Sequence, residues 1–413
     1  MRVCLYSFVL FLYRGLIRLA ALFQSKAKLM NEGQIKVWDG LEKQFNKNTR
    51  PVAWFHTASM GEFEQGRPII EAYKKENPTH FVLVTFFSPS GYEVRKNYAE
   101  ADYVSYLPLD GYFTSSRFLD LVKPSLAVFV KYEFWHYYLT GLQKRSIPTL
   151  LVSAIFRSNQ VFFKWYGGFY RRLLDCFTHL FVQDQASADL LQRANVSVAG
   201  DTRFDRVLDN LKNPISWDFL TEFVNNSEFM VVGSAWQADM DVLIPIINSK
   251  KYPFKWVIAP HEIHAEELKS WEDKIDLTVS YSKGPVRENA DVLFVNEVGR
   301  LANLYRGASF AYIGGAFGDG LHNTLEAAVF GPTVFFGNKN YQKFKEARDL
   351  IELGLAFPIG NSAELDQAMR GIYEDDQNFV NKQVQSRTFV QLQAGATERI
   401  MEFVRNLGVD GRK

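Results

Sequence analysis

The sequence predicts an α/β protein with two consecutive domains, each built around a parallel sheet. The chain has 413 residues, more than one hydrophobic core ordinarily serves, so we expect two domains. Short runs rich in Val, Leu, Phe and Tyr alternate with helical stretches. This alternation occurs twice, with a polar pause between the two series. Strands that alternate with helices predict a parallel sheet.

The first series begins at Pro51, after a polar, helical connector over Asn31–Arg50. Its expected strands are Val52–His56, His80–Phe86, Leu126–Val130, Thr149–Ser153 and His179–Val182. Its expected helices are Gly66–Glu76, Gly91–Tyr98, Ser116–Val122, Phe134–Lys144 and Ala186–Ala194.

The second series follows a polar segment containing Asn213-Pro214 and Asn225-Asn226, a composition typical of a linker. Its expected strands are Phe229–Val232, Trp256–Ala259, Leu277–Ser280, Val292–Val295, Phe310–Ile313 and Thr333–Phe336. Its expected helices are Met240–Ile247, Ala265–Trp271, Leu301–Arg306, Thr324–Val329 and Tyr341–Leu353, and the tail Phe379–Leu407 is also helical. We therefore divide the chain into 1–48, 49–210, 211–385 and 386–413. The last segment is expected to pack back across the domains.

Composition narrows the class of function. The net charge is only +1, so no nucleic acid or other polyanion is expected as a partner. The two cysteines, Cys4 and Cys176, form no spaced pair, so neither a disulfide framework nor a zinc site is expected. No HExxH or GxSxG motif occurs, so we expect neither a catalytic metal nor α/β-hydrolase chemistry.

The N-terminus is apolar from Val3 to Phe23, apart from Arg14 and Arg18 on one helix face. We favour a helix lying in a membrane interface, because charge on one face and Phe, Leu and Tyr on the other suit a headgroup boundary. The alternatives are a transmembrane anchor with snorkelling arginines, a secretory signal and a buried helix. For either anchor, Lys26 and Lys28 predict that the body lies on the cytoplasmic side.

Polar loops follow several strands of the first series, where ligands bind in parallel sheets. An aromatic strand ends at His56, and Ser59, Gly61 and Glu62 open a helix. Glu133 and Arg203 lie in two further loops. Each carboxylate could instead cap a helix, and Arg203 could be a solvated charge.

The second series carries a glycine-bearing turn, Gly314–Gly320, that leads into His322-Asn323 and Glu326. Backbone N–H groups at a helix N-terminus favour phosphate, and a carboxylate one turn in can hold ribose hydroxyls. A capped glycine turn is the alternative. GxGxxG and GxxxxGK[ST] are absent, which disfavours a classical dinucleotide site or P-loop. Similar loops follow other strands: Val232–Trp236, Ala259–Glu262 and Asn296–Leu301.

Together these motifs resemble those of the 3-deoxy-D-manno-octulosonic acid (Kdo) transferases of Gram-negative lipopolysaccharide synthesis. The matching segments are His56–Glu62, Tyr106–Asp110, Glu133–Trp135, Gly200–Asp205, Gly314-Gly315 and His322–Glu326. The resemblance extends over nearly the whole chain, including the apolar N-terminus. It implies a GT-B glycosyltransferase, with two Rossmann-like domains facing across a cleft and an N-terminal hydrophobic anchor helix.

The resemblance also implies roles for individual residues. Glu62 corresponds to the general base, with Ser59 and Gly61 in its acceptor-side loop, and Glu133 and Arg203 correspond to transition-state stabilisers. The donor-binding positions are Pro260, His261, Val298, Gly299, Arg300, Gly314, Gly315, His322, Asn323, Thr324, Leu325 and Glu326. The loops at Pro260-His261 and Gly299-Arg300 depart from the usual family sequences. We therefore hypothesise that Arg300 supplies the positive charge missing after Pro260.

The expected activity is inverting transfer of Kdo from CMP-Kdo to a lipid A precursor, without metal or cofactor, at the cytoplasmic face of the inner membrane. Residues 49–210 would bind the acceptor and 211–385 the donor. Phe63, Phe86, Phe87 and Trp135 could flank acyl chains or simply pack in the core. Two alternatives stay open: a GT-B enzyme or epimerase using another nucleotide sugar, and a non-catalytic membrane-bound sugar-nucleotide binder.

Overall fold

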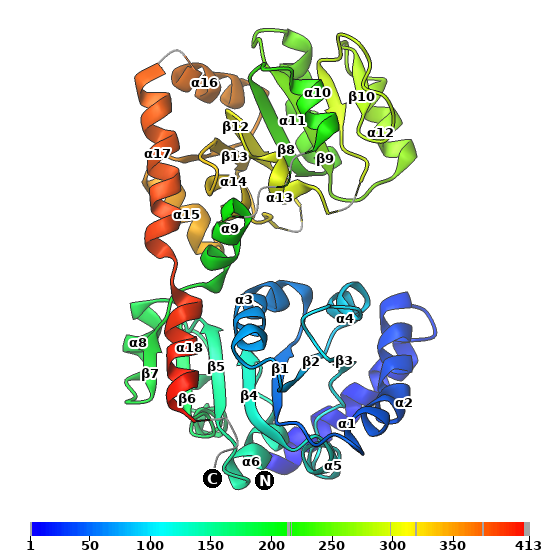
Figure 1. Ribbon diagram of the computed structural model, residues 1–413, viewed down its shortest axis with the longest axis vertical. Coiled ribbons are helices and arrows are strands. Elements are labelled where there is room, and N and C mark those ends of the chain that lie inside the picture. The colour runs from blue at the N-terminus through cyan, green and yellow to red at the C-terminus, as the bar shows by residue number, and fades with distance from the viewer. Residues whose placement is uncertain are drawn as a thin grey trace. The chain divides into compact units, whose positions relative to one another are not determined.

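The computed structural model describes residues 2–212, 215, 217–297, 299–318, 320–373 and 376–408. It divides into two compact units (Figure 1). Unit 1 comprises Met1–Arg206 and Ala394–Lys413, and unit 2 comprises Val207–Gln393. The C-terminal segment therefore returns to the unit in which the chain begins.

Unit 1 is built on a seven-stranded sheet with the order β3-β2-β1-β4-β5-β6-β7. All its neighbouring strands pair in parallel. The strands are β1 Val52–Thr57, β2 Phe81–Phe86, β3 Tyr103–Tyr106, β4 Pro124–Val130, β5 Thr149–Ala154, β6 His179–Val182 and β7 Val196–Val198. The chain order reverses between β1 and β4, and ligand sites form at such switch points of parallel sheets.

Helices cover both faces of this sheet, which explains why its central strands are apolar without alternation. Trp54 of β1 packs in one hydrophobic cluster and Phe55 in the other. The helices are α1 Arg2–Ala20, α2 Ser25–Phe45, α3 Met60–Glu76, α4 Pro89–Arg95, α5 Tyr112–Val122, α6 His136–Lys144, α7 Gly168–Leu174, α8 Gln185–Leu191 and α18 Ala396–Asn406, with the short 3₁₀ helix η1 Val161–Phe163. The helix α9, Thr202–Lys212, carries the chain out of unit 1.

Unit 2 repeats the architecture with a parallel sheet in the order β10-β11-β9-β8-β12-β13-β14. Its strands are β8 Phe229–Ala235, β9 Lys255–Pro260, β10 Val279–Tyr281, β11 Val292–Phe294, β12 Phe310–Ile313, β13 Thr333–Gly337 and β14 Ala356–Ile359. Its helices are α10 Asp218–Val224, α11 Gln237–Ser249, α12 Ala265–Glu272, α13 Leu301–Leu304, α14 Leu325–Ala328, α15 Lys345–Glu352, α16 Ser362–Tyr373 and α17 Asp376–Gln393.

The predicted α/β class with two parallel sheets is confirmed, and three strands were missed. These are β3, β7 and β14, each of only three or four residues. The tail is helical as predicted, but it forms two helices. Gly395, with φ +99°, separates α17 from α18 in a left-handed conformation that favours glycine. The expected boundary at residue 386 falls inside α17, where the Ser386 hydroxyl donates to the Ala328 carbonyl of unit 2.

The two tail helices pack on different units. Helix α17 contacts α14 and β13 of unit 2. Helix α18 contacts α3 of unit 1, where Ile400, Met401 and Val404 join a core that includes Ile69 and Ile70. Asp205 fixes its start, because it accepts from the backbone N–H and the hydroxyl of Thr397, each at 2.6 Å, and from the N–H of Gly395.

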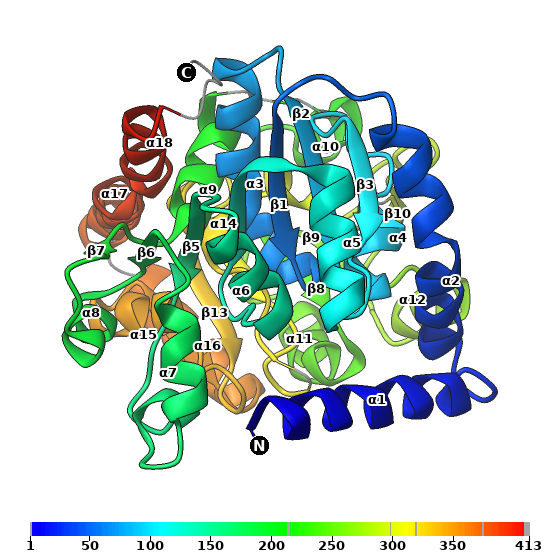
Figure 2. The ribbon, with the colours of Figure 1, turned by 90° about the horizontal axis from the view of Figure 1, so that it is seen from below.

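The N-terminal apolar helix is present as α1, which Figure 2 shows running along one edge of unit 1. It has 19 residues with a mean hydropathy of 1.6, enough by length and composition to cross a membrane. A signal sequence near an N-terminus passes the same test. Most of its large apolar side chains are exposed, including Phe8, Phe11 and Leu16.

Candidate functional site

A pair of carboxylates lies at the carboxyl ends of β1 and β4, beside the switch point of the unit 1 sheet. Glu62 stands in the first turn of α3, directly after β1, and Glu133 stands in the loop between β4 and α6. Strands β1 and β4 are neighbours in the sheet, so the fold brings together two side chains separated by 71 positions in the chain. Gly61 is exposed, and an added Cβ there would meet nothing within 4 Å.

One carboxylate oxygen of Glu62 binds the backbone just before α3. Its Oε2 atom accepts a hydrogen bond from the Ala58 N–H at 2.7 Å. Ser59 is the N-cap residue of α3, but its side chain makes no capping bond. Glu62 therefore caps the start of α3 through its Oε2 atom, as the alternative interpretation of this carboxylate predicted. Oε1 of Glu62 makes no hydrogen bond to any residue that the structure describes, so this oxygen is the one suited to accept a proton.

Glu133 is only 6% exposed and is held by two ring N–H groups. Its Oε2 atom accepts from Trp135 Nε1 at 2.6 Å and lies 2.9 Å from His56 Nε2. The other ring nitrogen of His56 lies 2.9 Å from the Thr85 hydroxyl, which itself accepts from Trp54 Nε1 at 2.8 Å. The same Nδ1 atom also lies 3.1 Å from the Thr85 backbone carbonyl oxygen. A carboxylate oxygen only accepts, so Nε2 of His56 carries the proton that it donates to Glu133.

The environment of Glu62 gives it an unusual acidity. Burial, and after it the nearby Glu133, raise the pKa of its carboxyl to about 7, against the opposing effects of the Ala58 N–H, His56 and Lys131. Desolvation and a like charge both disfavour the ionised form. A carboxyl group that exchanges its proton near neutral pH is suited to general base catalysis.

Arg203 lies in the first turn of α9, in the same unit, and is held by the residue two positions before it. Its Nε and a terminal guanidinium nitrogen donate to Asp201 Oδ2 at 2.9 and 2.6 Å. The adjacent Thr202 donates to the carbonyl of Gln65, in the helix that carries Glu62. The start of α9 is thus tied to α3, and the guanidinium is partly neutralised by Asp201.

In unit 2, Asp239 organises the loops that follow β8 and β12. Its Oδ2 atom accepts from the backbone N–H groups of Trp236 and Gly315, both at 3.0 Å, and Oδ1 accepts from the Tyr312 hydroxyl at 3.1 Å. Gly314 approaches β8 so closely that an added Cβ would lie 2.1 Å from the Ser234 carbonyl oxygen. Only glycine fits there.

Three aromatic rings gather at the ends of these strands. The His261 ring stacks on Trp236 at 4.3 Å between centroids and lies 4.6 Å from the His322 ring. Trp236 Nε1 donates to His322 Nε2 at 3.4 Å. Burial and the neighbouring His261 lower the pKa of His322 to about 4, so His322 is neutral at physiological pH. Its Nε2 accepts from Trp236, so its proton lies on Nδ1.

The remaining predicted donor residues lie in three places. Pro260 ends β9, and Gly299 has φ +83° just before α13. Thr324 is wholly buried, and its Oγ1 has no hydrogen-bond partner among the described residues. Leu325 is buried in the core, so only its backbone could face a ligand. Val298 lies outside the described residues.

Two side chains that were expected to face the donor have partners within unit 2. Arg300 donates to Glu297 Oε2 at 2.7 Å, and its guanidinium lies 3.7 Å from the Trp217 ring centroid. Its charge is thus partly offset by Glu297. Glu326 accepts from Asn323 Nδ2 at 3.2 Å, and Asn323 Oδ1 accepts from the Leu325 N–H. Asn323 thus makes local contacts at the start of α14, but the N-cap residue is Thr324, which makes no side-chain capping bond.

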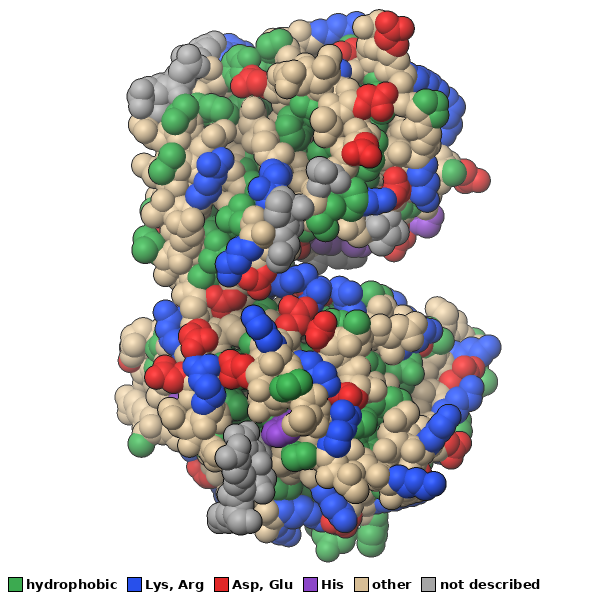
Figure 3. Space-filling view, in the orientation of Figure 1, with side chains coloured by type: hydrophobic (Ala, Val, Ile, Leu, Met, Phe, Trp, Pro, Cys, Tyr) green, Lys and Arg blue, Asp and Glu red, His purple; other side chains and the backbone are tan. Residues whose placement is uncertain are grey.

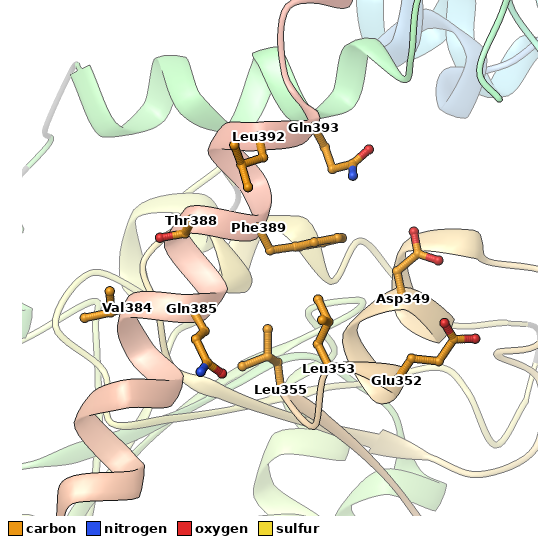
Figure 4. A pocket seen from close by; sticks show the side chains of 10 residues that line it. All are labelled: Asp349, Glu352, Leu353, Leu355, Val384, Gln385, Thr388, Phe389, Leu392 and Gln393. Carbon is orange, nitrogen blue, oxygen red and sulfur yellow. The ribbon is translucent and has the colours of Figure 1, made fainter. Parts of the chain in front are cut away.

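An apolar pocket of about 510 Å³ lies elsewhere in unit 2, between α15 and α17. Figure 4 shows Leu353 and Leu355 facing Phe389 across it, with Asp349 and Glu352 at one side. It lies beside α17 and holds none of the predicted site residues, so it is not the predicted donor site.

The part of the chain that carries the two carboxylates is similar to a known family. Residues 36–206, which include Glu62, Glu133 and Arg203, match the family model described as 3-Deoxy-D-manno-octulosonic-acid transferase (kdotransferase). The chain is 28% identical over 334 residues to the 3-deoxy-D-manno-octulosonic acid transferase of Aquifex aeolicus, covering 78% of this chain and 86% of that protein. It is 26% identical over 330 residues to the enzyme of the same name from Chlamydophila psittaci, covering 76% of each. These matches support membership of the Kdo transferase family.

Solved structures agree with a GT-B fold for this chain. The UDP-GlcNAc 2-epimerase from Neisseria meningitidis, bound to UDP-GlcNAc, superposes with a TM-score of 0.63 at 15% identity, covering 87% of this chain and all of that chain. MurG from Acinetobacter baumannii superposes with a TM-score of 0.55 at 12% identity, covering 86% of this chain and 99% of that chain. At such low identity the likeness concerns the fold alone.

The structure adds four residues to those predicted for the candidate site. His56 and Trp135 bind Glu133, while Trp236 and Asp239 shape the unit 2 loops. His56 and Trp135 stand inside the matched motifs, which is the signal that could have found them. The loop with Trp236 was noted as one that follows a strand, but nothing in the sequence links Asp239 to Gly315.

Proposed function

We propose that this protein is an inverting, metal-independent glycosyltransferase that moves Kdo from CMP-Kdo to a lipid A precursor resembling lipid IVA. The observation that carries the proposal is the carboxylate pair, with the half-buried Glu62 able to exchange a proton near neutral pH and the buried Glu133 fixed by His56 and Trp135. The names of the relatives in the family support the choice of Kdo as the transferred sugar.

In the proposed reaction, Glu62 accepts the proton of an acceptor hydroxyl as its oxygen attacks the anomeric carbon of Kdo. A new C–O bond forms on one face of the sugar, and the bond to the CMP phosphate breaks on the other, which inverts the configuration. The bonding electrons leave with CMP. A base is needed because a sugar hydroxyl is a weak nucleophile.

Glu133 and Arg203 are proposed to stabilise the charges of this transition state. Positive charge develops at the anomeric carbon, and the fixed Glu133 carboxylate is suited to stabilise it. Arg203 carries a cation that can face the Kdo carboxylate or the departing phosphate. Its contact with Asp201 fixes the guanidinium before substrate arrives.

Unit 2 is proposed to bind the CMP part of the donor. The stacked rings of Trp236 and His261 offer an apolar surface for the base, and the N-terminus of the Thr324–Glu326 segment offers N–H groups for phosphate. The unpartnered Thr324 hydroxyl supports a polar ligand there. His322, being neutral, would act as a hydrogen-bond donor and not as a cation.

The acceptor is proposed to be a membrane lipid, met at the cytoplasmic face of the inner membrane. Exposed apolar side chains on α1, together with Tyr112, Phe113, Trp165 and Tyr166 of unit 1, suit a lipid interface. Figure 3 shows hydrophobic side chains at the foot of unit 1, where the N-terminus and α5 lie in Figure 1.

The direct test is to incubate the full-length protein with a lipid A precursor and either CMP-Kdo or UDP-sugars, and to read product masses. Products with CMP-Kdo alone, undiminished by EDTA, support the proposal. Products with a UDP-sugar would indicate another nucleotide-sugar enzyme of the same fold. Binding of CMP-Kdo without turnover of any acceptor would indicate a sugar-nucleotide binder.

A further inference from the structure

The N-terminal helix α1 is attached to unit 1 along one face. Half-buried residues recur at Tyr6, Leu10, Ile17 and Ala20, with Tyr13 between them at 37% exposure. This spacing of three or four residues marks one face of a helix. The opposite face carries the exposed apolar side chains. One face of α1 therefore packs on unit 1, and the other is exposed.

The first attachment is polar and leads to the start of α6. The Tyr6 hydroxyl donates to Asp110 Oδ2 at 2.7 Å and accepts from the His136 N–H at 3.3 Å. Asp110, 6% exposed, also accepts from the backbone N–H groups of Tyr137 and Tyr138, at 3.0 and 3.1 Å. An acidic side chain from another segment thus caps α6, and Tyr6 completes that cap.

The second attachment is aromatic and leads to Glu133 itself. The Tyr13 ring stacks on Phe87 with 6.2 Å between centroids, and Phe87 packs on Trp135 at 4.8 Å. Trp135 then donates its ring N–H to Glu133. The loop Lys131–Trp135 lies between the end of β4 and the start of α6, so contacts from α1 hold both its last residue and the helix that follows it.

We propose that α1 is a positioning element of the reaction centre as well as a membrane-facing helix. Tyr6 and Tyr13 are positioning residues: they act through Asp110 and Phe87 on the loop that carries Glu133. The expected effect on kcat rests on the proposed function. The contacts from Tyr6 and Tyr13 to the Glu133 loop are found within unit 1 and do not depend on it. Contact of α1 with lipid would therefore bear on the geometry of Glu133.

The test uses full-length Tyr6→Phe, Tyr13→Leu and the double variant. The control is Tyr252→Phe, which also removes a tyrosine-to-aspartate hydrogen bond, to Asp366 in unit 2 at 2.9 Å. Acceptor and enzyme are mixed in detergent micelles, so that membrane recruitment does not limit the rate. We expect kcat to fall about 10-fold in the double variant, since small misplacements of reacting groups cost up to about 10²-fold. The KM for CMP-Kdo should not change, and Tyr252→Phe should match wild type.

A second readout needs no turnover. In protein labelled with ¹³C at the glutamate carboxyls, the Glu62 titration should shift in the double variant, because its neighbour Glu133 has moved, and should stay unchanged in Tyr252→Phe. An unshifted titration with normal kcat in micelles would overturn the proposal and leave α1 as an anchor alone. If wild type shows no transfer while the titration shifts, the proposed function fails and the positioning link stands.

Discussion

His56 Nε2 lies 2.9 Å from Glu133 Oε2, and both side chains are buried at the carboxyl ends of adjacent strands. Burying a carboxylate is costly unless hydrogen bonds compensate it. Here two ring N–H groups, from His56 and Trp135, converge on one oxygen. This arrangement fixes the negative charge that in turn contributes to the raised pKa of Glu62.

Activity should depend on pH through Glu62. A base must be deprotonated to act, and burial raises the pKa of this carboxyl to about 7. We expect kcat/KM for transfer to rise about tenfold per pH unit below about 7 and to level off above it. Initial rates between pH 5 and 9, at fixed ionic strength, measure this. A rate that is already maximal at pH 5 would exclude Glu62 as the base.

Stability should depend on pH in the opposite direction. The folded-state pKa of Glu62 is raised, so its favourable contribution is complete below the unfolded value of 4.5 and is lost as pH rises through about 7. Glu62→Gln should therefore gain stability over wild type from pH 5 to 8, by at most about 3 kcal/mol at 1.36 kcal/mol per pKa unit. Urea unfolding at pH 5 and pH 8 measures the difference. The control is Glu64→Gln, a half-buried carboxyl of α3 paired with Arg95, which should not gain stability.

Removing His56 should impair the proposed reaction while leaving both carboxyl groups in the chain. In His56→Leu, Glu133 loses one of its two donors, and we expect kcat to fall on the order of 10- to 100-fold. Because His56 also lowers the pKa of Glu62, the acid limb of the pH profile should move to higher pH. The matched control is His80→Leu, a buried histidine bonded to Tyr73 just before β2. If His80→Leu moves the pH profile equally, the effect is general destabilisation.

Asp239 should control the donor loops of unit 2. In Asp239→Ala, the N–H groups of Trp236 and Gly315 lose their acceptor, at a cost of about 1–3 kcal/mol of stability. We expect a higher KM for CMP-Kdo and a weaker calorimetric affinity for CMP. Asp239→Asn keeps an acceptor oxygen and should be milder, and Asp241→Ala, on the exposed side of α11, should be neutral. Equal affinity for CMP in Asp239→Ala and wild type would contradict this role.

Most of the fold could be predicted because its strands are strongly apolar and its helices regular. The strands missed, such as Val196–Val198, are too short to give a periodic signal. The split of the tail could not be predicted, because a single glycine, Gly395, inside a helical pattern is compatible with either one helix or two.

The sequence predicted which loops carry the candidate site residues, but not the contacts that those residues make. Glu62 and Glu133 were found because each follows a strand in a recognisable motif. Their partners depend on side-chain direction and long-range contact. Whether His56 turns toward Thr85 and Glu133, or Tyr6 reaches Asp110, 104 positions away, is decided by packing that no local pattern encodes. The pairing of Arg300 with Glu297 likewise became visible only in the structure.

The central claim is that Glu62 is the base of a Kdo transfer. Its most direct test is the mass of the lipid product formed from CMP-Kdo and a lipid A precursor, followed in time for wild type and Glu62→Gln. The account predicts a product heavier by Kdo residues with wild type, and a rate roughly 10²- to 10⁴-fold lower with Glu62→Gln at unchanged CMP affinity. Near-normal product formation by Glu62→Gln would contradict it.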